Sequence, residues 1–368
     1  MKAFKIRCVR PEKPSPFRTD KKSCATFVMM QQKTGKVSLK DIAREVGVSV
    51  ALVSYVLNNR FENRISKDVA DKIRKTAKRL QYQPNQIAKS LKTNKTFTIG
   101  LVVADIANPF SSSLARIIED EGAKYGYTVI FGSSDEDLER FEKLTNTFLN
   151  RQVDGLILLP PEGAEEQLIR LKKTNFPFVI VDRYFPKIEA HYVNVNNIKA
   201  AYDAVKLFID NGKKRIGLIN YKTALHHLND RTKGYTRALK EAKITPDKSL
   251  VKRVGIDNDP AEITKAVTSL LSAPAVDAIL FASNRIAVHA LMYLQQEHIA
   301  IPGSLQVIAF DEHEVFDFYR PQLTFVKQPM LQLGQTATDL LIDIITKNKI
   351  EQQVFIPAEI IKRGSTGR

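Results

Sequence analysis

Cysteine is nearly absent from this chain of 368 residues, because Cys8 and Cys24 are its only two and both precede residue 36. The remaining body can form no disulfide framework and no cysteine-based metal site, and this composition agrees with a reducing cytosol. Long apolar runs are also absent, and no apolar segment follows the basic start. We therefore expect a cytoplasmic protein with neither a membrane span nor a secretory signal.

Catalytic sequence motifs are missing as well. The chain contains no GxSxG, no Walker loop, no HExxH and no glycine-rich dinucleotide fingerprint. The adjacent His226 and His227 have no Cys or carboxylate at metal-ligand spacing around them. We expect no enzyme activity, no cofactor and no metal site.

Basic residues outnumber acidic ones at one end of the chain and are balanced by them elsewhere. The formal net charge is +16; residues 1–95 hold 23 Lys and Arg against 7 Asp and Glu, and the rest holds 33 of each. Lysines and arginines often merely solvate helix faces. Their segregation favours a surface that binds a phosphate backbone by releasing its counterions.

The stretch 37–58, VSLKDIAREVGVSVALVSYVLN, predicts two short helices around a tight turn. Apolar side chains at helical spacing form a buried stripe, Gly47 supplies the turn and Ser49 can cap the second helix. The pattern indicates a helix-turn-helix. The second helix leaves outward small or hydrogen-bonding side chains that can enter a major groove, namely Val50, Ala51, Ser54, Tyr55 and Asn58.

The basic end divides into three segments. Residues 1–35 contain several prolines and show neither helical nor strand period, so we expect a disordered basic extension. Ser66 is a suitable N-cap for a third helix, which completes a helix-turn-helix domain over residues 36–83. Residues 84–95 carry too little apolar surface to fold alone, and we interpret them as a linker that can order on binding.

From Phe97 onward, short apolar strands alternate with helix-compatible segments. Such strands are typical of parallel sheets that are buried on both faces. Two doubly wound sheets facing each other would form a cleft at the carboxyl ends of their strands, so we expect two α/β lobes within residues 96–368. The predicted strands span residues 97–103, 128–132, 155–159, 178–181, 215–219, 278–282 and 306–310.

Several motifs, taken in order, resemble those of the lactose repressor (LacI/GalR) family of transcription regulators. They are LKDIAREVGVS, LVSYVLN, YQPNQIAKSLKT, TIGLVVADIANPF, the Asp-Arg of VIVDR, RTKGY, and the block from VIAFDEHE to PQLTFVKQP. Each motif alone is weak, but their order and spacing over residues 37–368 are specific. The resemblance implies an all-α helix-turn-helix headpiece followed by a two-lobed α/β effector domain like that of periplasmic binding proteins.

The resemblance also implies how the second helix contacts DNA. A recognition helix would run from Ser49 to Asn58, with Val50, Ala51 and Tyr55 toward base edges and Ser54 and Asn58 toward phosphate. Relatives usually carry Thr-Val-Ser-Arg where this chain reads Leu-Val-Ser-Tyr. An arginine can pair bidentately with guanine, whereas a tyrosine makes a single hydrogen bond and its ring can contact a thymine methyl. The operator sequence is therefore not predicted.

A hinge helix is implied for the linker, from Asn85 to Lys92. Leu91 would be an apolar wedge pushed into a central base step from the minor groove, which bends the duplex and extends its contact with protein. Ala88 would pack against its dimer mate, and Lys92 would lie close to the DNA backbone. Without the family, Leu91 would be interpreted as an ordinary core leucine.

The resemblance further implies an effector site between the lobes. Arg231 and Asp311 could grip vicinal hydroxyls through charge-assisted hydrogen bonds. The residues themselves allow other roles, since Asp182 and Asp311 could be helix N-caps and Phe110 could belong to the core. Asn284 stands where relatives often carry Asp, which favours an effector other than a simple neutral hexose. The implied effector-binding residues are Phe110, Asp182, Arg183, Arg231, Asn284 and Asp311.

We therefore expect a sequence-specific DNA-binding regulator, a repressor, whose operator affinity is controlled by a sugar or sugar derivative. Its partners would be a near-palindromic double-stranded operator and a second copy of the chain, since no leucine heptads for a tetramer follow Ile361. A solute-binding receptor of the periplasmic type is the alternative. That function would require an export signal and would have no use for a helix-turn-helix.

Overall fold

The computed structural model describes residues 37–61, 64–83, 95–272, 274–347 and 352–367. The chain forms two compact units, Met1–Asn85 and Gln86–Arg368, which are described separately. The expected extension and nearly all of the expected linker lie outside the described residues. Within the described ranges, none of the helices combines the length and the hydrophobicity that crossing a bilayer requires.

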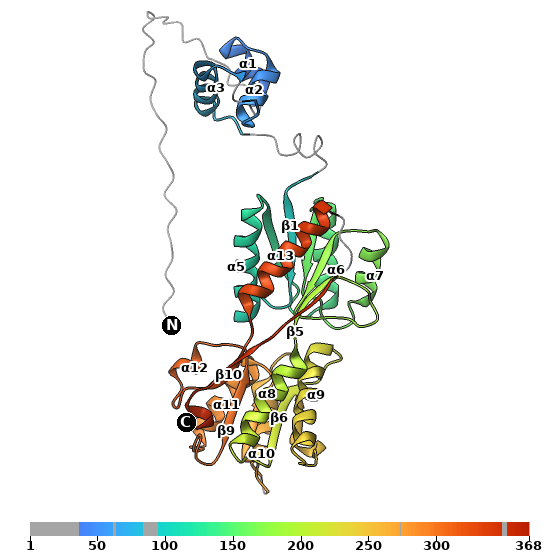
Figure 1. Cartoon of the computed structure of the whole chain (residues 1–368), viewed down its shortest axis with the longest axis vertical. Coiled ribbons are helices and arrows are strands. Elements are labelled where there is room, and N and C mark those ends of the chain that lie inside the picture. Colours follow the sequence, from blue (N-terminus) through green and yellow to red (C-terminus); the bar gives the residue numbers. More distant parts are fainter. Residues whose placement is uncertain (1–36, 62–63, 84–94, 273, 348–351, 368) are drawn as a thin grey trace, which may run out of the picture. The chain divides into compact units, whose positions relative to one another are not determined.

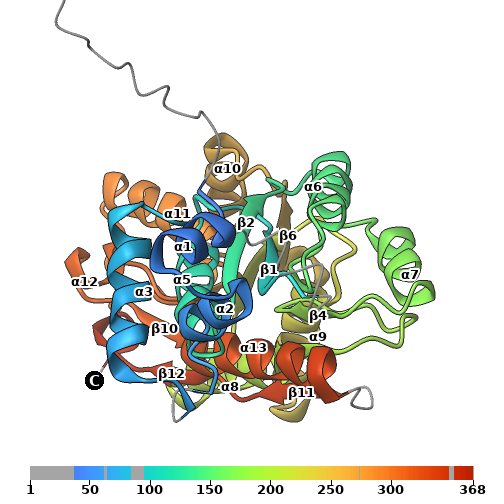
Figure 2. The same ribbon diagram turned by 90° about the horizontal axis from the view of Figure 1, so that it is seen from above.

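The described part of the first unit contains three helices (Figures 1 and 2). Ile42, Val53 and Ile73, one from each helix, meet in its core with no exposed surface. The predicted stripe is thus buried, and the three-helix arrangement is confirmed. The helices are α1 (Leu39–Val46), α2 (Val50–Leu57) and α3 (Lys67–Arg79).

The predicted turn and caps of this unit are present. Gly47 ends α1 with φ of 79°, a left-handed conformation that glycine adopts without a Cβ clash. The Ser49 hydroxyl accepts a hydrogen bond from the amide of Leu52 at 3.2 Å, and Ser66 does the same for Val69 at 3.4 Å. These bonds satisfy amide groups that an uncapped helix would leave unpaired.

The first lobe of the second unit is a sheet of parallel strands in the order β11-β5-β4-β3-β1-β2. Helices α5 and α13 pack side by side against one face, and α6 and α7 cover the other (Figure 1). The elements are β1 (Thr98–Val103), α5 (Pro109–Lys124), β2 (Thr128–Ser133), α6 (Leu138–Asn150), β3 (Gly155–Leu158), α7 (Glu165–Lys173), β4 (Phe178–Val181), β5 (Tyr192–Val195), α13 (Met330–Lys347) and β11 (Gln353–Ile356).

The second lobe is a sheet in the order β12-β10-β9-β8-β6-β7, parallel except for β12, which runs antiparallel to β10. Helices α8 and α9 pack on one face, and α10 and α11 on the other. The elements are α8 (Asn197–Asp210), β6 (Ile216–Tyr221), α9 (His226–Glu241), β7 (Val251–Val254), α10 (Pro260–Leu271), β8 (Ala278–Phe281), α11 (Asn284–Gln296), β9 (Gln306–Phe310), α12 (Val315–Phe318), β10 (Thr324–Lys327) and β12 (Glu359–Ile361), with short 3₁₀ turns at Lys248–Leu250 and Gly364–Thr366.

The chain passes between the lobes three times, from β5 to α8, from β10 to α13 and from β11 to β12 (Figure 1). All seven predicted strands are present, and the expected fold class is confirmed. The described residues contain five further strands that were not predicted: β5, β7, β10, β11 and β12. In a doubly wound fold, residues that follow the strands at their carboxyl ends meet at one edge of each sheet, and here those edges face a common cavity.

Candidate functional site

The outward face of α2 is open, as the sequence predicts. Val50 and Tyr55 are 39% and 40% exposed, while Val53 and Val56 of the same helix are buried. Ala51 is also exposed. Helix α2 therefore presents small and aromatic side chains to whatever the unit binds.

Two polar residues predicted on this face serve the helix itself. The Ser49 hydroxyl caps the start of α2, and the Asn58 side-chain amide donates to the backbone oxygen of Ser54 at 2.7 Å, where the helix ends. Among the residues predicted on this face, Val50, Ala51 and Tyr55 are consequently the main ones that remain available to contact another molecule. The predicted hinge residues Asn85, Ala88, Leu91 and Lys92 lie outside the described residues.

Between the two lobes lies a cavity of about 80 Å³. Side chains from both sheets line it, and most of them follow strands at their carboxyl ends. The structure brings five of the six predicted effector residues together here: Phe110, Asp182, Arg183, Arg231 and Asp311. Phe110 both lines the cavity and packs against the first-lobe core.

Asp182 and Asp311 occupy equivalent positions in the two lobes, directly after β4 and β9. Both have left-handed backbones, with φ of 66° and 67°. Neither caps a described helix, so the N-cap alternative does not apply to them. Burial raises the pKa of Asp182 to about 6, against the smaller effect of Arg231 and Arg183, which lower it. Its Oδ1 atom has no hydrogen-bond partner among the described residues.

His227 is a cavity residue that sequence reasoning missed. Its Nε2 atom lies 4.0 Å from Oδ2 of Asp182, although 45 positions separate the two residues in the sequence. Burial, followed by the charges of Arg183 and Arg231, lowers the pKa of His227 well below its usual value. The imidazole is therefore neutral at pH 7. No short-range spacing rule could connect residues that lie so far apart.

The cavity contains three arginines, and each is engaged. Arg183 donates to both carboxylate oxygens of Glu136, and Arg285 donates to Asp105 across the cleft. Arg231 donates its Nε–H to Asn197 at 2.8 Å and another N–H to a backbone oxygen, and it lies 4.1 Å from the centre of the Phe310 ring. The cationic side chains are thus held in place by protein groups.

Asn284 is the predicted effector residue that does not line the cavity. It is fully buried at the start of α11, where its amide nitrogen donates to the backbone oxygen of Glu312 at 3.5 Å. Its Oδ1 atom has no partner among the described residues. The residue after it, Arg285, reaches the cavity instead.

Further polar groups in the cavity were not predicted. The Gln328 amide donates to Asp311, and its Oε1 atom is buried without a partner among the described residues. Tyr221 and Ser283 share a hydrogen bond of 2.7 Å between their hydroxyl groups. Tyr221 ends β6 and Ser283 follows β8, so the rule for strand ends could have found both. Gln328 follows β10, which the sequence did not reveal.

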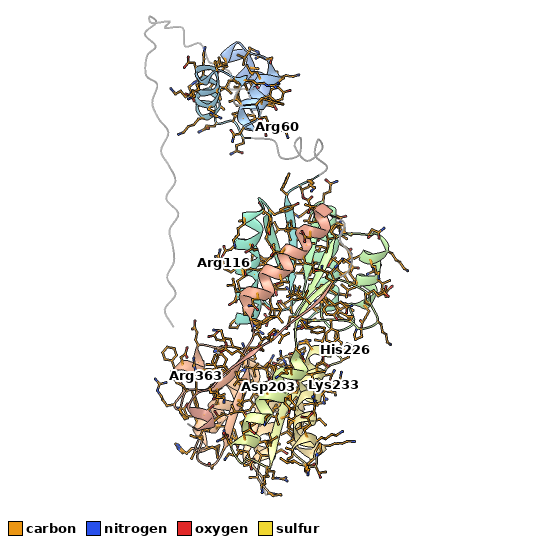
Figure 3. All side chains as sticks on the ribbon, in the orientation of Figure 1. Arg60, Arg116, Asp203, His226, Lys233 and Arg363 are labelled. Atoms are coloured by element: carbon orange, nitrogen blue, oxygen red, sulfur yellow. The ribbon has the colours of Figure 1, made fainter. Side chains whose placement is uncertain are left out.

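Direct bonds hold the two lobes together around the cavity. The Tyr184 hydroxyl of the first lobe donates to Asp230 of α9, and the Thr223 hydroxyl donates to Glu162 at 2.6 Å. The His226 ring lies 5.5 Å from that of Tyr184; His226 is labelled in Figure 3, at the end of the second lobe that faces the first. A groove of about 520 Å³ adjoins the cavity and shares Phe110, Asp311 and Gln328 with it.

Comparison with known proteins identifies both units. Residues 38–85 match the family "Bacterial regulatory proteins, lacI family", and residues 205–366 match "Periplasmic binding protein-like domain". Catabolite control protein A of Priestia megaterium is 32% identical over 90% of this chain and 99% of its own length.

Two solved structures extend the likeness. The complex of the transcriptional regulator CelR with cellobiose is 25% identical, covers 89% of this chain and 99% of its own, and has a TM-score of 0.68. The Lac repressor dimer bound to operator covers 91% of this chain and all of its own, with a TM-score of 0.81. At 21% identity, the latter shows the shared fold alone.

These likenesses favour a regulator over the periplasmic solute receptor, because they include the helix-turn-helix unit as well as the two lobes. The motif resemblance found in the sequence is confirmed. The chain belongs to the LacI family of bacterial regulatory proteins and is a DNA-binding transcription regulator.

Proposed function

We propose that the protein is a repressor that binds a near-palindromic operator as a homodimer and releases or tightens its grip when a small carbohydrate binds between the lobes. The observation that carries this proposal is the open, uncharged face of α2 within a strongly basic part of the chain. The Lac repressor neighbour is a dimer bound to operator, and the CelR neighbour holds cellobiose. Both support the same arrangement for this chain.

On the DNA side, we assign base contacts to Val50, Ala51 and Tyr55 of α2. Ser54 and Asn58 would lie near phosphate, as would the basic side chains around them. Leu91, outside the described residues, would act as the minor-groove wedge with Ala88 and Lys92 beside it, in a hinge that begins at Asn85. Leu91→Ala should then weaken binding to the operator far more than binding to random duplex, and equal losses would remove the wedge role.

On the effector side, the charges in the cavity favour an uncharged ligand. The lining holds three arginines, Arg183, Arg231 and Arg285, against four carboxylates, Asp105, Glu136, Asp182 and Asp311, and His227 is neutral, so it has no excess positive charge for an anion. Asp182 Oδ1 and Gln328 Oε1 are buried acceptors that lack donors among the described residues. A hydroxyl-rich neutral molecule would supply those donors, and an unpaired buried acceptor costs about 1–3 kcal/mol.

The size of the cavity indicates how the ligand would act. A volume of about 80 Å³ is below the ~300 Å³ at which drug-sized sites begin. Entry of a sugar would therefore require the lobes to separate, breaking bonds such as those of Tyr184 and Thr223. Such a change could shift the hinge and alter operator affinity about 5–150-fold.

We further propose that the chain binds its effector without transforming it and acts in the cytoplasm, where its DNA is found. The named relatives are transcription regulators, and no catalytic motif is present in the sequence. The test begins with selection of duplexes from a random pool by the full-length protein. A selected site bound no better than a scrambled one would contradict the regulator function.

The effector class is tested with matched pairs of sugars by calorimetry. Cellobiose and glucose are compared with cellobionate, glucuronate and glucose 6-phosphate, which add a negative charge to a similar ring. We expect a neutral member to bind and its charged counterpart to bind at least about tenfold more weakly, because the lining holds more carboxylates than arginines. Stronger binding of the charged member would refute the uncharged class while leaving DNA binding intact.

A further inference from the structure

Two exposed aromatic rings meet at the end of α2. Tyr55 is 40% exposed and Phe61, in the loop after the helix, is 55% exposed. Their ring centroids are 5.1 Å apart and the rings stand at 80°, edge to face. We call this pair the aromatic corner. It leaves two apolar surfaces facing solvent on the unit that binds DNA.

The backbone holds Phe61 in this position. Its φ is 56°, a left-handed conformation that is unfavourable for a bulky side chain. The amide of Arg60 donates to the backbone oxygen of Tyr55 at 2.8 Å, and Phe61 accepts from the amide of Arg64 at 2.9 Å. Arg60 is labelled on this loop in Figure 3. The Arg64 guanidinium lies 5.9 Å from the Phe61 ring centre, so a cation flanks the corner.

The chemistry of α2 restricts what the corner can contact. The helix, Val-Ala-Leu-Val-Ser-Tyr-Val-Leu, has no charged residue, and no arginine on it can pair with guanine. In the major groove, the one apolar group on a base edge is the C5-methyl of thymine. The exposed surfaces of the two rings offer such a methyl group an apolar contact, and burying apolar surface is favourable.

We propose that Phe61 is a specificity-determining residue which, together with Tyr55, forms a contact site for one thymine methyl in each operator half-site. This inference rests on the proposed operator binding by α2. It assigns a base contact to a loop residue that follows the recognition helix. It also gives Tyr55 an apolar role in place of the guanine contact that an arginine would make.

The test uses a duplex selected by the full-length protein, in which each thymine is replaced singly by uracil. Uracil keeps every base-pairing group and lacks only the methyl. We expect one position per half-site to lose about fourfold in affinity, the value of one buried methyl-sized group. For Phe61→Ala, affinity should fall and the thymine-to-uracil ratio at that position should approach one.

Two controls isolate the methyl contact. Tyr55→Phe keeps the ring and should retain the thymine-to-uracil affinity ratio. Loss of that ratio in Tyr55→Phe would show that the hydroxyl reads the base and would overturn the inference. Lys72→Ala removes an exposed cation of α3 and should leave the ratio unchanged. Circular dichroism verifies folding, and lowering the salt strengthens binding until weak variants can be measured.

The outcomes separate the two proposals. The role of the aromatic corner would be overturned if the selected site had no methyl-sensitive thymine, or if Phe61→Ala kept the thymine-to-uracil affinity ratio of the wild type. Operator binding would stand in either case. Failure to select any preferred duplex would overturn both.

Discussion

The headpiece and the cleft use charge in opposite ways. In the headpiece, basic side chains such as Lys40, Lys72 and Lys75 stand exposed on the surface. In the cleft, arginines such as Arg183 and Arg231 are buried and bonded to protein groups. Exposed cations attract a polyanion without regard to sequence, whereas buried and paired ones shape a site and contribute little to attraction from a distance.

On these proposals, selectivity in both places resides in groups other than the basic side chains. On α2, exposed side chains near Tyr55 are apolar, so we propose that they distinguish bases by shape and methyl contact. In the cleft, we propose that Asp182 Oδ1 and Gln328 Oε1 distinguish ligands by requiring hydrogen-bond donors. We therefore expect the basic side chains to attract DNA to the first unit, and the α2 side chains and the cleft acceptors to decide which DNA and which sugar are bound.

Salt should separate the two regions most strongly. Raising salt from 50 to 200 mM should weaken operator binding by about 10³–10⁵-fold if 6–10 phosphates are contacted. Effector affinity, measured by calorimetry over the same range, should change less than about twofold, because the proposed effector carries no charge and salt screens buried charges little. Equal salt dependence of the two affinities would contradict the comparison.

Neutralising Asp182 should stabilise the protein at neutral pH. Its pKa is raised from 3.8 to about 6, so the charged form opposes folding above about pH 6 and the cost vanishes as pH falls below 3.8. The free energy of unfolding of Asp182→Asn should therefore exceed that of the wild type by about 3 kcal/mol at pH 7.5 and by little at pH 4.

Urea unfolding at both pH values measures this difference. His227, whose pKa is lowered, contributes the opposite slope, because the unfolded state binds its proton first as the pH falls. That contribution is common to wild type and variant. If variant and wild type differed equally in unfolding free energy at the two pH values, burial would not destabilise the ionised Asp182 carboxylate.

Removing Arg231 should uncouple the cleft from DNA. Arg231→Ala should bind operator like the wild type without sugar, since Arg231 belongs to the second unit, and should lose the 5–150-fold response to a bound sugar. Arg237→Ala, on the same helix but exposed and paired with Glu241, should keep that response. A full response in Arg231→Ala would clear this residue of any part in the effector site.

Loosening the lobes should change rates more than affinity. Tyr184→Phe removes the hydroxyl that bonds Asp230 across the cleft, so association and dissociation of the sugar should both accelerate about tenfold while their ratio stays nearly constant. Tyr202→Phe, which removes a similar bond to Glu241 within the second lobe, serves as the matched control in stopped-flow measurements. Unchanged rates in Tyr184→Phe would show that the bond does not restrain opening.

The sequence predicts those parts of the fold whose signals are local. The stripe around Ile42, the turn at Gly47 and the cap at Ser49 are each set by neighbours within a few residues, and all are present. The seven predicted strands are nearly all apolar because both their faces are covered. Local chemistry is sufficient for these elements.

The strands that escaped prediction carry polar residues. β5 holds the buried Asn194, and β7 and β12 lie at sheet edges, where Lys252 and Glu359 interrupt the apolar pattern. β10 ends in an exposed lysine before Gln328. Such strands are defined by their partners in the sheet, and a single sequence does not display those partners.

The candidate site was found where family motifs marked it and missed elsewhere. Asp182, Arg231 and Asp311 line one cavity as expected, whereas Asn284 does not line it and His227 lies beside Asp182. The last pairing joins two lobes through long-range folding. The sequence around Phe61 does not indicate its proposed role either, because that role depends on its contact with the Tyr55 ring.

The most direct test of the account is the ratio of affinities of the full-length protein for a duplex selected from a random pool and for a scrambled duplex of equal composition, at one salt concentration. The account predicts a ratio of about 10³ or more, as base reading by the open face of α2 requires. A ratio near one would show that the basic end merely binds polyanions, and would contradict it.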